Sequence, residues 1–344
     1  MTRLPDFELG QRCDLTRGGV ATLGVFDGVH IGHQAIIQRT LERSHELGKP
    51  STLITFSVHP RSIVNGKAPK QLISLEHRLR LVEALGVDAI LVMAFTEELR
   101  LVEAEDFVQK VFVDTLGVRA LVIGHDTAFG RSRRGDAGLL RALAEHHGFT
   151  LDVVEPVFIG GTPVSSTRIR DAILSGDLDL AQAMLGRPVS LLGTVVLGDG
   201  RGRALGFPTA NLQLHHAAYP KAGVYAVRVF VADRPPARPG VCNIGKRPTF
   251  REGEEDTIEV HLLDWREDLY DRELRVEFVA RLRDERRFPN VAELVAQIGR
   301  DAARAREILA ASGEPLPTQP AGRAPRPLGS TTARLPESTP QKGD

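Results

Sequence analysis

The feature that most constrains the fold is an alternation of short apolar runs with amphipathic stretches through the first half of the chain. The apolar runs predict strands over Val20–Phe26, Thr52–Phe56, Ala89–Met93, Ala120–Ile123 and Leu151–Val154. The stretches between them predict helices over Gln34–Leu47, Leu75–Leu85, Ala104–Leu116 and Leu139–His147. Nearly continuous apolar strands that alternate with helices indicate a parallel sheet covered on both faces. In such folds ligands bind beyond the carboxyl ends of the strands.

The pattern changes near Gly186-Arg187-Pro188. From there we expect strands without intervening helices, over Val189–Leu197, Gly223–Phe230, Gly240–Ile244, Thr257–Leu263 and Glu273–Leu282. Glycine and proline separate them, which indicates an antiparallel sheet or a small barrel. A final helix is expected from Val291, with Asn290 as its N-cap and Glu293 in the capping-box position.

The length of 344 residues favours two modules, each large enough to bury a core. We expect the first over residues 15–185 and the second over residues 186–311. Residues 312–344 are rich in Pro, Thr, Ser and Gly and poor in large apolar side chains, which is typical of a disordered tail.

Charge and cysteine content exclude several classes of protein. The 44 Lys and Arg balance the 44 Asp and Glu, so no overall basic field favours nucleic acid or an anionic membrane as a partner. The two cysteines, Cys13 and Cys242, cannot form a disulfide framework. No signal peptide or membrane-spanning run is recognisable. We expect a soluble, cytoplasmic protein with no nucleic-acid or membrane partner, and the sequence leaves a homo-oligomer open.

The segment from Gly24 to His33, here named the histidine turn, places two histidines three residues apart where a strand gives way to a helix. Residues at this spacing share a face of the first helical turn. The free N–H groups and positive dipole end of a helix N-terminus favour phosphate. Gly28 and Gly32 allow the backbone to approach a ligand closely. The segment therefore predicts a site for the phosphates of a nucleotide, and the alternative is an ordinary turn with surface histidines.

A second phosphate-binding candidate is Ser165-Ser166-Thr167-Arg168-Ile169-Arg170, which follows the last strand of the first module and opens a helical stretch ending near Gly176. Hydroxyl groups in a first helical turn, with an arginine one turn later, suit polyphosphate oxygens. The alternative is a helix cap with surface arginines, because serine and threonine are common caps.

The second module contains a glycine-rich segment, Gly198 to Asn211, with four glycines within nine residues. Such a backbone can surround a phosphate with N–H groups. Thr209 and Asn211 offer neutral oxygens that, with phosphate oxygens and waters, could complete a Mg²⁺ shell. A loose glycine loop is the alternative, since glycine patterns by themselves are weak signals.

The first two of these segments resemble the nucleotidyltransferase superfamily with its histidine-x-glycine-histidine motif. Five motifs in one order then resemble the bacterial bifunctional riboflavin kinase/FAD synthetase family over residues 15 to 310. They are the histidine turn, Ser165–Arg170, Gly206–Asn211, Asn243–Thr249 and Glu259–Asp264. The resemblance implies an α/β, Rossmann-like nucleotidyltransferase module followed by a mostly antiparallel β-barrel kinase module with a C-terminal helix. It implies that ATP phosphorylates riboflavin to FMN and that a second ATP adenylylates FMN to FAD, releasing pyrophosphate.

The resemblance also implies roles for single residues. His30 and His33 would hold the phosphates at the reacting centre of adenylyl transfer, and Ser166, Thr167 and Arg170 would hold the leaving pyrophosphate. Glu259 would be the base that takes the proton from the riboflavin hydroxyl, while Thr209 and Asn211 would bind Mg²⁺ and ATP. Asp126 and Arg283 would contact the flavin. The remaining ATP or phosphate contacts would come from Gly24, Phe26, Asp27, Gly28, Gly32, Gly198, Gly202 and Gly206.

Spacing alone favours a solvent-facing strand glutamate at Glu259, and Arg283 could equally belong to a solvated charged edge. One departure from the family pattern bears on function. Thr127 stands where the family usually has an aromatic residue, which puts the affinity for FMN in doubt. The alternative function is therefore a riboflavin kinase whose first module is defective in FMN adenylylation.

Overall fold

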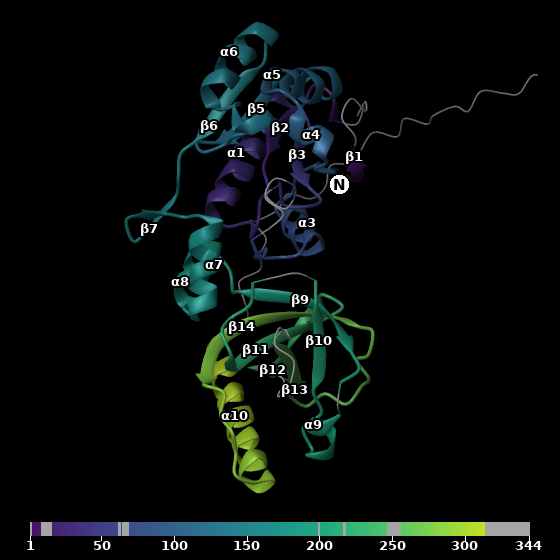
Figure 1. The fold of residues 1–344 in the computed structure, drawn as a ribbon, viewed down its shortest axis with the longest axis vertical. Coiled ribbons are helices and arrows are strands. Elements are labelled where there is room, and N and C mark those ends of the chain that lie inside the picture. The colour runs from purple at the N-terminus through teal and green to yellow at the C-terminus, as the bar shows by residue number, and fades with distance from the viewer. Residues whose placement is uncertain are drawn as a thin grey trace, which may run out of the picture.

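The computed structural model describes residues 2–7, 16–60, 63, 69–198, 200–215, 218–245 and 256–313. Figure 1 shows two units stacked along the long axis of the molecule, an α/β unit above and a barrel below, with a long C-terminal helix against the barrel. The expected disordered tail, apart from Ser312 and Gly313, lies outside the described residues, as does Cys13.

The α/β unit contains a six-stranded sheet in the order β1-β4-β3-β2-β5-β6, in which every pair of neighbours is parallel. Its strands are β1 (Thr2–Phe7), β2 (Val20–Leu23), β3 (Ser51–Phe56), β4 (Ala89–Met93), β5 (Ala120–Gly124) and β6 (Thr150–Val154). Beside β2 the sheet continues outward through β3 and β4 in chain order, with β1 at its edge, and beside β5 it continues to β6. The chain order therefore reverses between β2 and β5. The crevice between these two strands is therefore a topological switch point, the usual ligand position of such sheets.

Helices cover both faces of this sheet, as expected. Successive strand residues point to opposite faces, so Leu53 packs with α1 and α3 while Ile54 packs with α5, η2 and α6. The helical segments of this unit are α1 (Ile31–Leu47), α3 (Leu75–Ala84), α4 (Glu97–Leu101), α5 (Ala104–Phe107), η2 (Val108–Thr115), η3 (Arg131–Arg133), α6 (Ala137–His147), α7 (Ser166–Ser175) and α8 (Leu178–Leu185). A short hairpin, β7 (Phe158–Ile159) and β8 (Thr162–Pro163), precedes α7.

Two expectations for this unit need correction. The strand predicted over Val20–Phe26 ends at Leu23, because Phe26 has a φ of 51°, which no extended strand accommodates. The helix predicted over Ala104–Leu116 is α-helical only to Phe107 and continues as the π-helical segment η2, whose wider turns carry an additional residue.

The second unit is a closed antiparallel barrel in the order β10-β13-β12-β11-β14-β9. Its elements are β9 (Ser190–Val196), α9 (Arg201–Ala204), β10 (Ala210–Leu214), β11 (Gly223–Val231), β12 (Arg234–Gly245), β13 (Thr257–Leu262), β14 (Glu273–Arg283) and α10 (Val291–Ala311). The expectation that no helix precedes the last one is wrong, because α9 lies within the glycine-rich segment. The other expectations of fold class are confirmed, and Asn290 caps α10 through Glu293 N.

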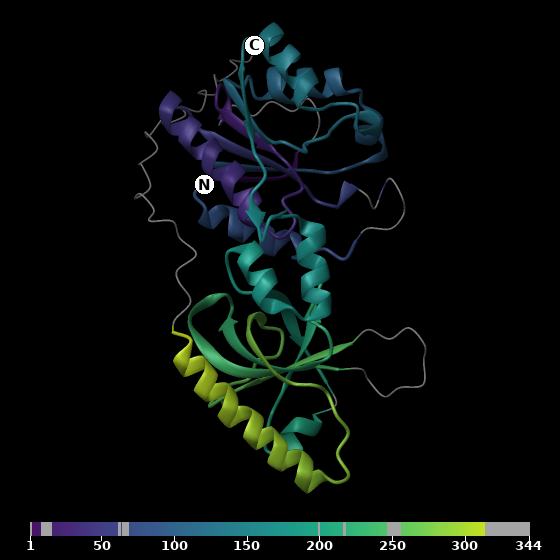
Figure 2. The same ribbon diagram turned by 90° about the vertical axis from the view of Figure 1, so that its left-hand side faces the viewer.

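The two units share an apolar core. Helices α7 and α8 lie between the sheet and the barrel (Figure 2), and their buried side chains join those of the barrel strands in one cluster. Ile169 and Ile173 from α7 and Met184 from α8 contact this cluster, together with Val227 and Val276 from the barrel.

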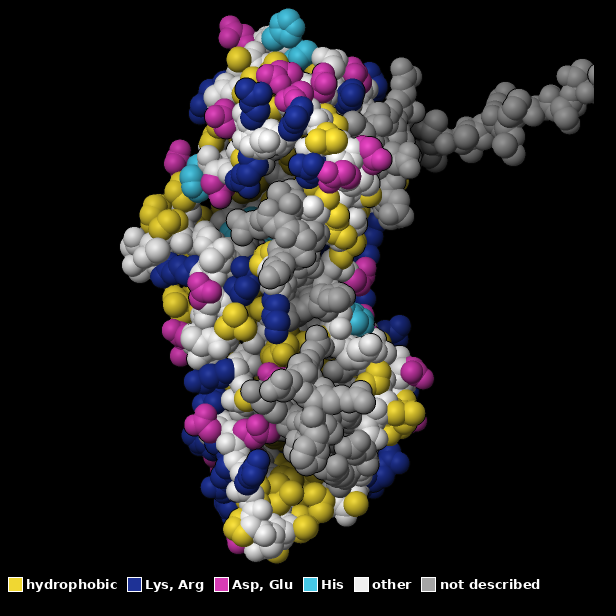
Figure 3. Space-filling model, in the orientation of Figure 1, with side chains coloured by type: hydrophobic (Ala, Val, Ile, Leu, Met, Phe, Trp, Pro, Cys, Tyr) yellow, Lys and Arg dark blue, Asp and Glu magenta, His cyan; other side chains and the backbone are white. Residues whose placement is uncertain are grey.

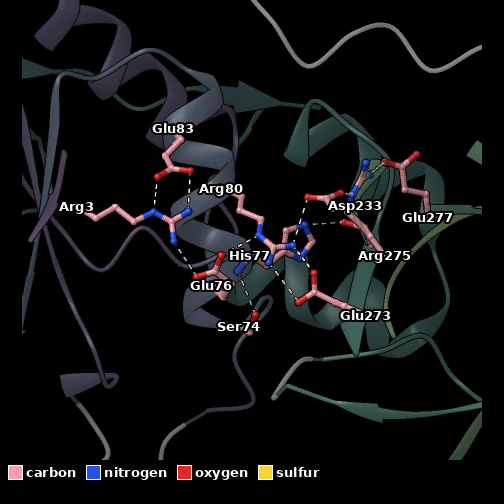
Figure 4. Close-up of polar contacts among 11 residues, drawn as sticks. Arg3, Ser74, Glu76, His77, Arg80, Glu83, Asp233, Glu273, Arg275 and Glu277 are labelled. Atoms are coloured by element: carbon pink, nitrogen blue, oxygen red, sulfur yellow. Dashed lines mark hydrogen bonds and ion pairs between the residues drawn. The ribbon is translucent and has the colours of Figure 1, made fainter. Parts of the chain in front are cut away.

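A polar layer also joins the units, between α3 and the barrel (Figure 4). Arg80 on α3 donates to Glu273 at the start of β14 and to Asp233 in the β11–β12 turn. Arg80 also pairs with Glu76 one turn earlier on the same helix, at 2.8 Å. His77, almost fully buried, lies 3.5 Å from the Ser190 hydroxyl at the start of β9.

Acidic and basic side chains alternate over the face shown in Figure 3, in keeping with the balanced net charge. Within the described ranges, no helix is long and apolar enough to cross a membrane.

The buried His77 predicts a pH dependence of stability. Burial lowers its pKa in the folded protein to about 3, whereas an unfolded histidine has a pKa near 6.5. Between these values the unfolded chain binds a proton that the folded chain does not. The contribution of neutral His77 to the free energy of unfolding is therefore fully present above about pH 6.5 and is lost as the pH falls. Relative to His77→Gln, the wild-type protein should lose about 2 kcal/mol more unfolding free energy between pH 7 and pH 5. Urea titrations at several pH values measure the unfolding free energy of both proteins. Parallel profiles of this free energy against pH would contradict the prediction.

Candidate active sites

The histidine turn leaves the carboxyl end of β2 as a tight turn with unusual backbone angles. Val29 N donates to Phe26 O at 3.1 Å, and Phe26, Gly28 and Val29 have φ values of 51°, 83° and 41°. A Cβ added at Gly28 would lie 2.6 Å from Leu72 Cδ1, so both the angle and the space require glycine. Positive φ is uncommon outside glycine and unfavourable for a β-branched residue such as Val29.

A buried arginine, a partly buried arginine and a buried aspartate hold this turn in place. Arg78 on α3, 3% exposed, donates to Val25 O and, at 2.9 Å, to Phe56 O. The Asp27 carboxylate accepts from Leu72 N at 2.8 Å and from Arg170 Nη2 at 3.0 Å. Burial raises the pKa of Asp27, and the Arg170 guanidinium opposes that shift.

His30 and His33 form a stacked pair at the N-terminus of α1. Their ring centroids are 3.6 Å apart, and His30 caps the helix through Nδ1, which accepts from His33 N at 3.3 Å. Burial lowers the pKa of His30 to about 4 and that of His33 well below its ordinary value. Both imidazoles are therefore neutral at neutral pH, and because His30 Nδ1 accepts from His33 N, the proton of His30 lies on Nε2.

The structure brings the second phosphate candidate to the same place. Ser166 Oγ donates to Asp27 O at 3.0 Å, and Arg170 reaches the Asp27 carboxylate from the next turn of α7. Thr167 is exposed beside them. The N-termini of α1 and α7 thus converge on one turn, which concentrates their positive dipole ends.

A cavity of about 720 Å³ opens beside the histidine turn, at the switch point between β2 and β5. Gly24, Phe26, Asp27, His33 and Ser166 line one side. The loop after β5 contributes Asp126, Thr127 and Ala128. An apolar wall completes the cavity, formed by Leu23, Phe56, Phe95, Leu99, Phe107 and Phe129. Such a cavity can hold a flat apolar ring system beside a phosphate site.

The second unit carries its polar residues in a row across three strands. Asn211 on β10 pairs with Glu259 on β13, which pairs with Asn243 on β12. Their neighbours Leu212 and Val260 fill the barrel interior, so the row faces outward. Its strands meet the glycine-rich segment, where α9 marks the end of the barrel remote from the α/β unit (Figure 1).

The glycine-rich segment folds closely over this row. A Cβ at Gly198 would lie 2.0 Å from Asn211 Nδ2, and one at Gly202 would lie 3.0 Å from Thr209 Oγ1. Gly206 has a φ of 84°. The neutral oxygens of Thr209 and Asn211 fit a Mg²⁺ ion that keeps phosphate oxygens and waters as its other ligands. Within the described ranges, no cluster of three or more His, Cys, Asp or Glu offers a metal site.

Arg283 does not lie free for a ligand. Its guanidinium binds Asp301 of α10 at 2.8 and 2.9 Å and donates to Asp284 O. The motif residues 246–249 and Asp199 lie outside the described residues.

Of the three arginines that bind the histidine turn, the sequence predicts Arg170 as a site residue but not Arg78 or Arg187. Arg78 lies in a predicted helix beside Leu79 and Val82 on its buried face. The sequence signal that could have identified Arg78 is a charged residue on the apolar face of a predicted helix. A buried arginine needs hydrogen-bond partners, so its position indicates a polar contact there. The phenylalanines of the cavity wall were also missed, since their separation in sequence hides their common position.

Two family models match the chain, FAD synthetase over residues 13–168 and riboflavin kinase over residues 185–309. A bifunctional riboflavin kinase/FMN adenylyltransferase from Pseudomonas fluorescens is 43% identical over 296 residues, covering 86% of this chain and 94% of that protein. Proteins of the same name from Escherichia coli strain K12 and Bacillus subtilis are 40% and 36% identical, covering 84% and 83% of this chain and 92% and 91% of their own lengths.

Among solved structures, a crystal structure described as a macrolide-efflux protein from Streptococcus pneumoniae has a TM-score of 0.79 and 29% identity. It covers 89% of this chain and 99% of its own, so the likeness extends over both units. Together the two family models span both units, and the relatives and this solved structure each match the chain over both units, which carry the two sites described above. The chain belongs to the bifunctional riboflavin kinase/FMN adenylyltransferase family.

Proposed function

We propose that this protein phosphorylates riboflavin to FMN at the barrel site and adenylylates FMN to FAD at the histidine turn, using ATP in both reactions. Residues 15–185 would form the adenylyltransferase module and residues 186–311 the kinase module. Family membership supports the pair of reactions. We expect a cytoplasmic enzyme without nucleic-acid or membrane partners.

The N-termini of α1 and α7 and the stacked pair of neutral histidines converge beside a cavity with an aromatic wall, which His33 and Ser166 line, and this convergence supports the proposal most strongly. The helix ends and the neutral N–H donors suit a triphosphate, and the wall suits the flavin ring. In the family's reaction an FMN phosphate oxygen attacks the α-phosphorus of ATP and pyrophosphate leaves. His30 and His33 would hold the reacting phosphates, and Ser166, Thr167 and Arg170 would hold the pyrophosphate. Catalysis would consist of positioning and charge stabilisation.

At the barrel site, Glu259 would act as the base, beside its strand partner Asn211. It would accept the proton of the riboflavin hydroxyl as that oxygen attacks the γ-phosphorus of ATP and ADP leaves. The glycine-rich segment would surround the phosphates. Mg²⁺, held by Thr209, Asn211 and phosphate oxygens, would neutralise charge on the transferred group.

The alternative, a kinase with a defective first module, rests on Thr127. The cavity wall argues against it, because Phe56, Phe95, Phe107 and Phe129 supply aromatic surface from other elements. Asp126 also lines the cavity, as expected for a flavin contact, whereas the ion pair of Arg283 with Asp301 favours a structural role for that arginine.

The product profile from riboflavin, ATP and Mg²⁺ tests the function. We expect FMN to appear first and FAD to follow, as separated by chromatography. FMN alone would support the kinase-only alternative, and neither product would refute both.

Replacing both histidines, His30→Ala with His33→Ala, should lower FAD formation from supplied FMN by roughly 10²-fold or more. Riboflavin phosphorylation should continue, because Glu259 lies in the other unit, and it serves as the internal control. FAD formation at the wild-type rate would show that the histidines have another role.

Asn211→Ala should weaken the kinase and raise the Mg²⁺ concentration it needs, because a neutral oxygen ligand is lost. Asn243→Ala, in the same strand row, is the matched control and should leave the Mg²⁺ titration unchanged. Identical titrations of wild type and Asn211→Ala would refute the metal role.

Glu259→Gln should lower kinase turnover by roughly 10²- to 10⁴-fold, the usual contribution of a positioned general base. The change keeps the shape of the side chain, so riboflavin and ATP affinities should remain near the wild-type values. Turnover within a few-fold of wild type would show that Glu259 is not the base.

A further inference from the structure

Arg187 belongs to the segment between α8 and β9, yet its head group reaches the histidine turn of the other unit. Its Nη2 donates to Gly28 O at 2.6 Å. Its Nη1 donates to Val29 O at 3.1 Å and to Leu185 O at 3.4 Å. The side chain is buried, with 8% exposed. One guanidinium therefore holds the two carbonyls that immediately precede His30.

These two carbonyls belong to the part of the turn with the least favourable backbone. Gly28 and Val29 both have positive φ, a backbone region that is unfavourable for residues other than glycine. A conformation of this kind persists only when the surroundings determine it. Gln34 of α1 also donates to Val29 O and to Leu185 O, at 2.9 Å each. Arg187 and Gln34 together fix the direction in which α1, and with it His30 and His33, begins.

A carboxylate of the barrel, that of Glu277, favours the positive charge of Arg187. Burial lowers its pKa to about 10, and the Glu277 carboxylate on β14 opposes this shift. Glu277 is itself buried and pairs with Arg275. An arginine satisfies several carbonyls at once, which lysine cannot do with the same planar geometry. The cationic group thus binds carbonyls of the first unit and is favoured electrostatically by a carboxylate of the second.

We propose that Arg187 is a positioning residue for adenylyl transfer, through which the barrel unit sets the geometry of the histidine turn in the other unit. The inference rests on the proposed adenylyltransferase function. A displacement of the turn would move both histidines and the N-terminus of α1 relative to the phosphates. Shifts of about 1 Å at such groups can cost roughly 10²-fold in rate.

Arg80 provides a matched control. It is also an arginine between the two units, and it binds Glu273 and Asp233 of the barrel (Figure 4). Its hydrogen bonds within the described part of the chain go to these residues and Glu76, not to the histidine turn. Arg80→Met therefore weakens the contact between units without removing a donor from the turn. Arg187→Met removes the donors and keeps most of the side-chain volume, and Arg187→Lys keeps the charge and part of the donor set.

The experiment measures kcat and KM for FAD formation from supplied FMN and ATP, and kinase activity on riboflavin, in all four proteins. We expect Arg187→Met to lower kcat for adenylyl transfer by roughly 10²-fold with a smaller change in KM for FMN, whose ring cavity is intact. Arg187→Lys should recover part of this loss. Kinase activity should stay at the wild-type level in both, and Arg80→Met should retain both activities.

Equal loss of adenylyl transfer in Arg80→Met and Arg187→Met would overturn the proposal, since contact between the units would then suffice. Wild-type kcat in Arg187→Met would overturn it as well. If Arg187→Met loses both activities, Arg187→Lys decides: a selective loss of adenylyl transfer supports the proposal, and a proportional loss of both contradicts it. A wild-type protein that forms no FAD would refute the proposed function instead.

Discussion

The structure of the first unit depends on the interaction between three arginines and the backbone of one turn. Arg78, Arg170 and Arg187 approach the histidine turn from α3, α7 and the segment before β9. Arg78 and Arg187 donate hydrogen bonds to carbonyl groups of the turn, and Arg170 donates to the Asp27 carboxylate. Guanidinium groups suit this task because their several donors lie in a fixed plane. The turn can then direct α1 and α7 toward one point, where two helix N-termini favour phosphate.

The two proposed reactions take place in separate environments. The histidine turn has neutral imidazoles beside a partly open cavity, which suits a transfer that needs positioning rather than proton removal. The barrel site has a half-buried carboxylate on an outward strand face, which suits a hydroxyl group that must lose a proton. Because α9 marks the end of the barrel remote from the first unit, FMN made there would have to leave before it enters the cavity.

Much of the fold could be predicted because local signals coincide with the buried pattern. The strand Ala89–Met93 is found with both ends as expected, and Gly48, Gly148 and Gly176 end their helices in left-handed conformations. Several failures share a physical cause. The end of β2 at Leu23 and the roles of Arg78 and Arg187 depend on contacts with segments remote in sequence. Helix α9 has only four residues, too few for periodicity to identify, and the sequence Ala-Asn-Leu-Gln-Leu of β10 contains no β-branched or aromatic residue to mark a strand.

A crystal structure with FMN and a non-hydrolysable ATP analogue would show whether the histidine turn is the adenylyl-transfer site. We expect a triphosphate at the N-terminus of α1, in contact with His30 and the start of α7, and a flavin ring against the phenylalanine wall. We also expect Arg187 to remain bound to the carbonyls of Gly28 and Val29. A triphosphate bound away from this turn, with the cavity free of flavin, would show that adenylyl transfer takes place elsewhere.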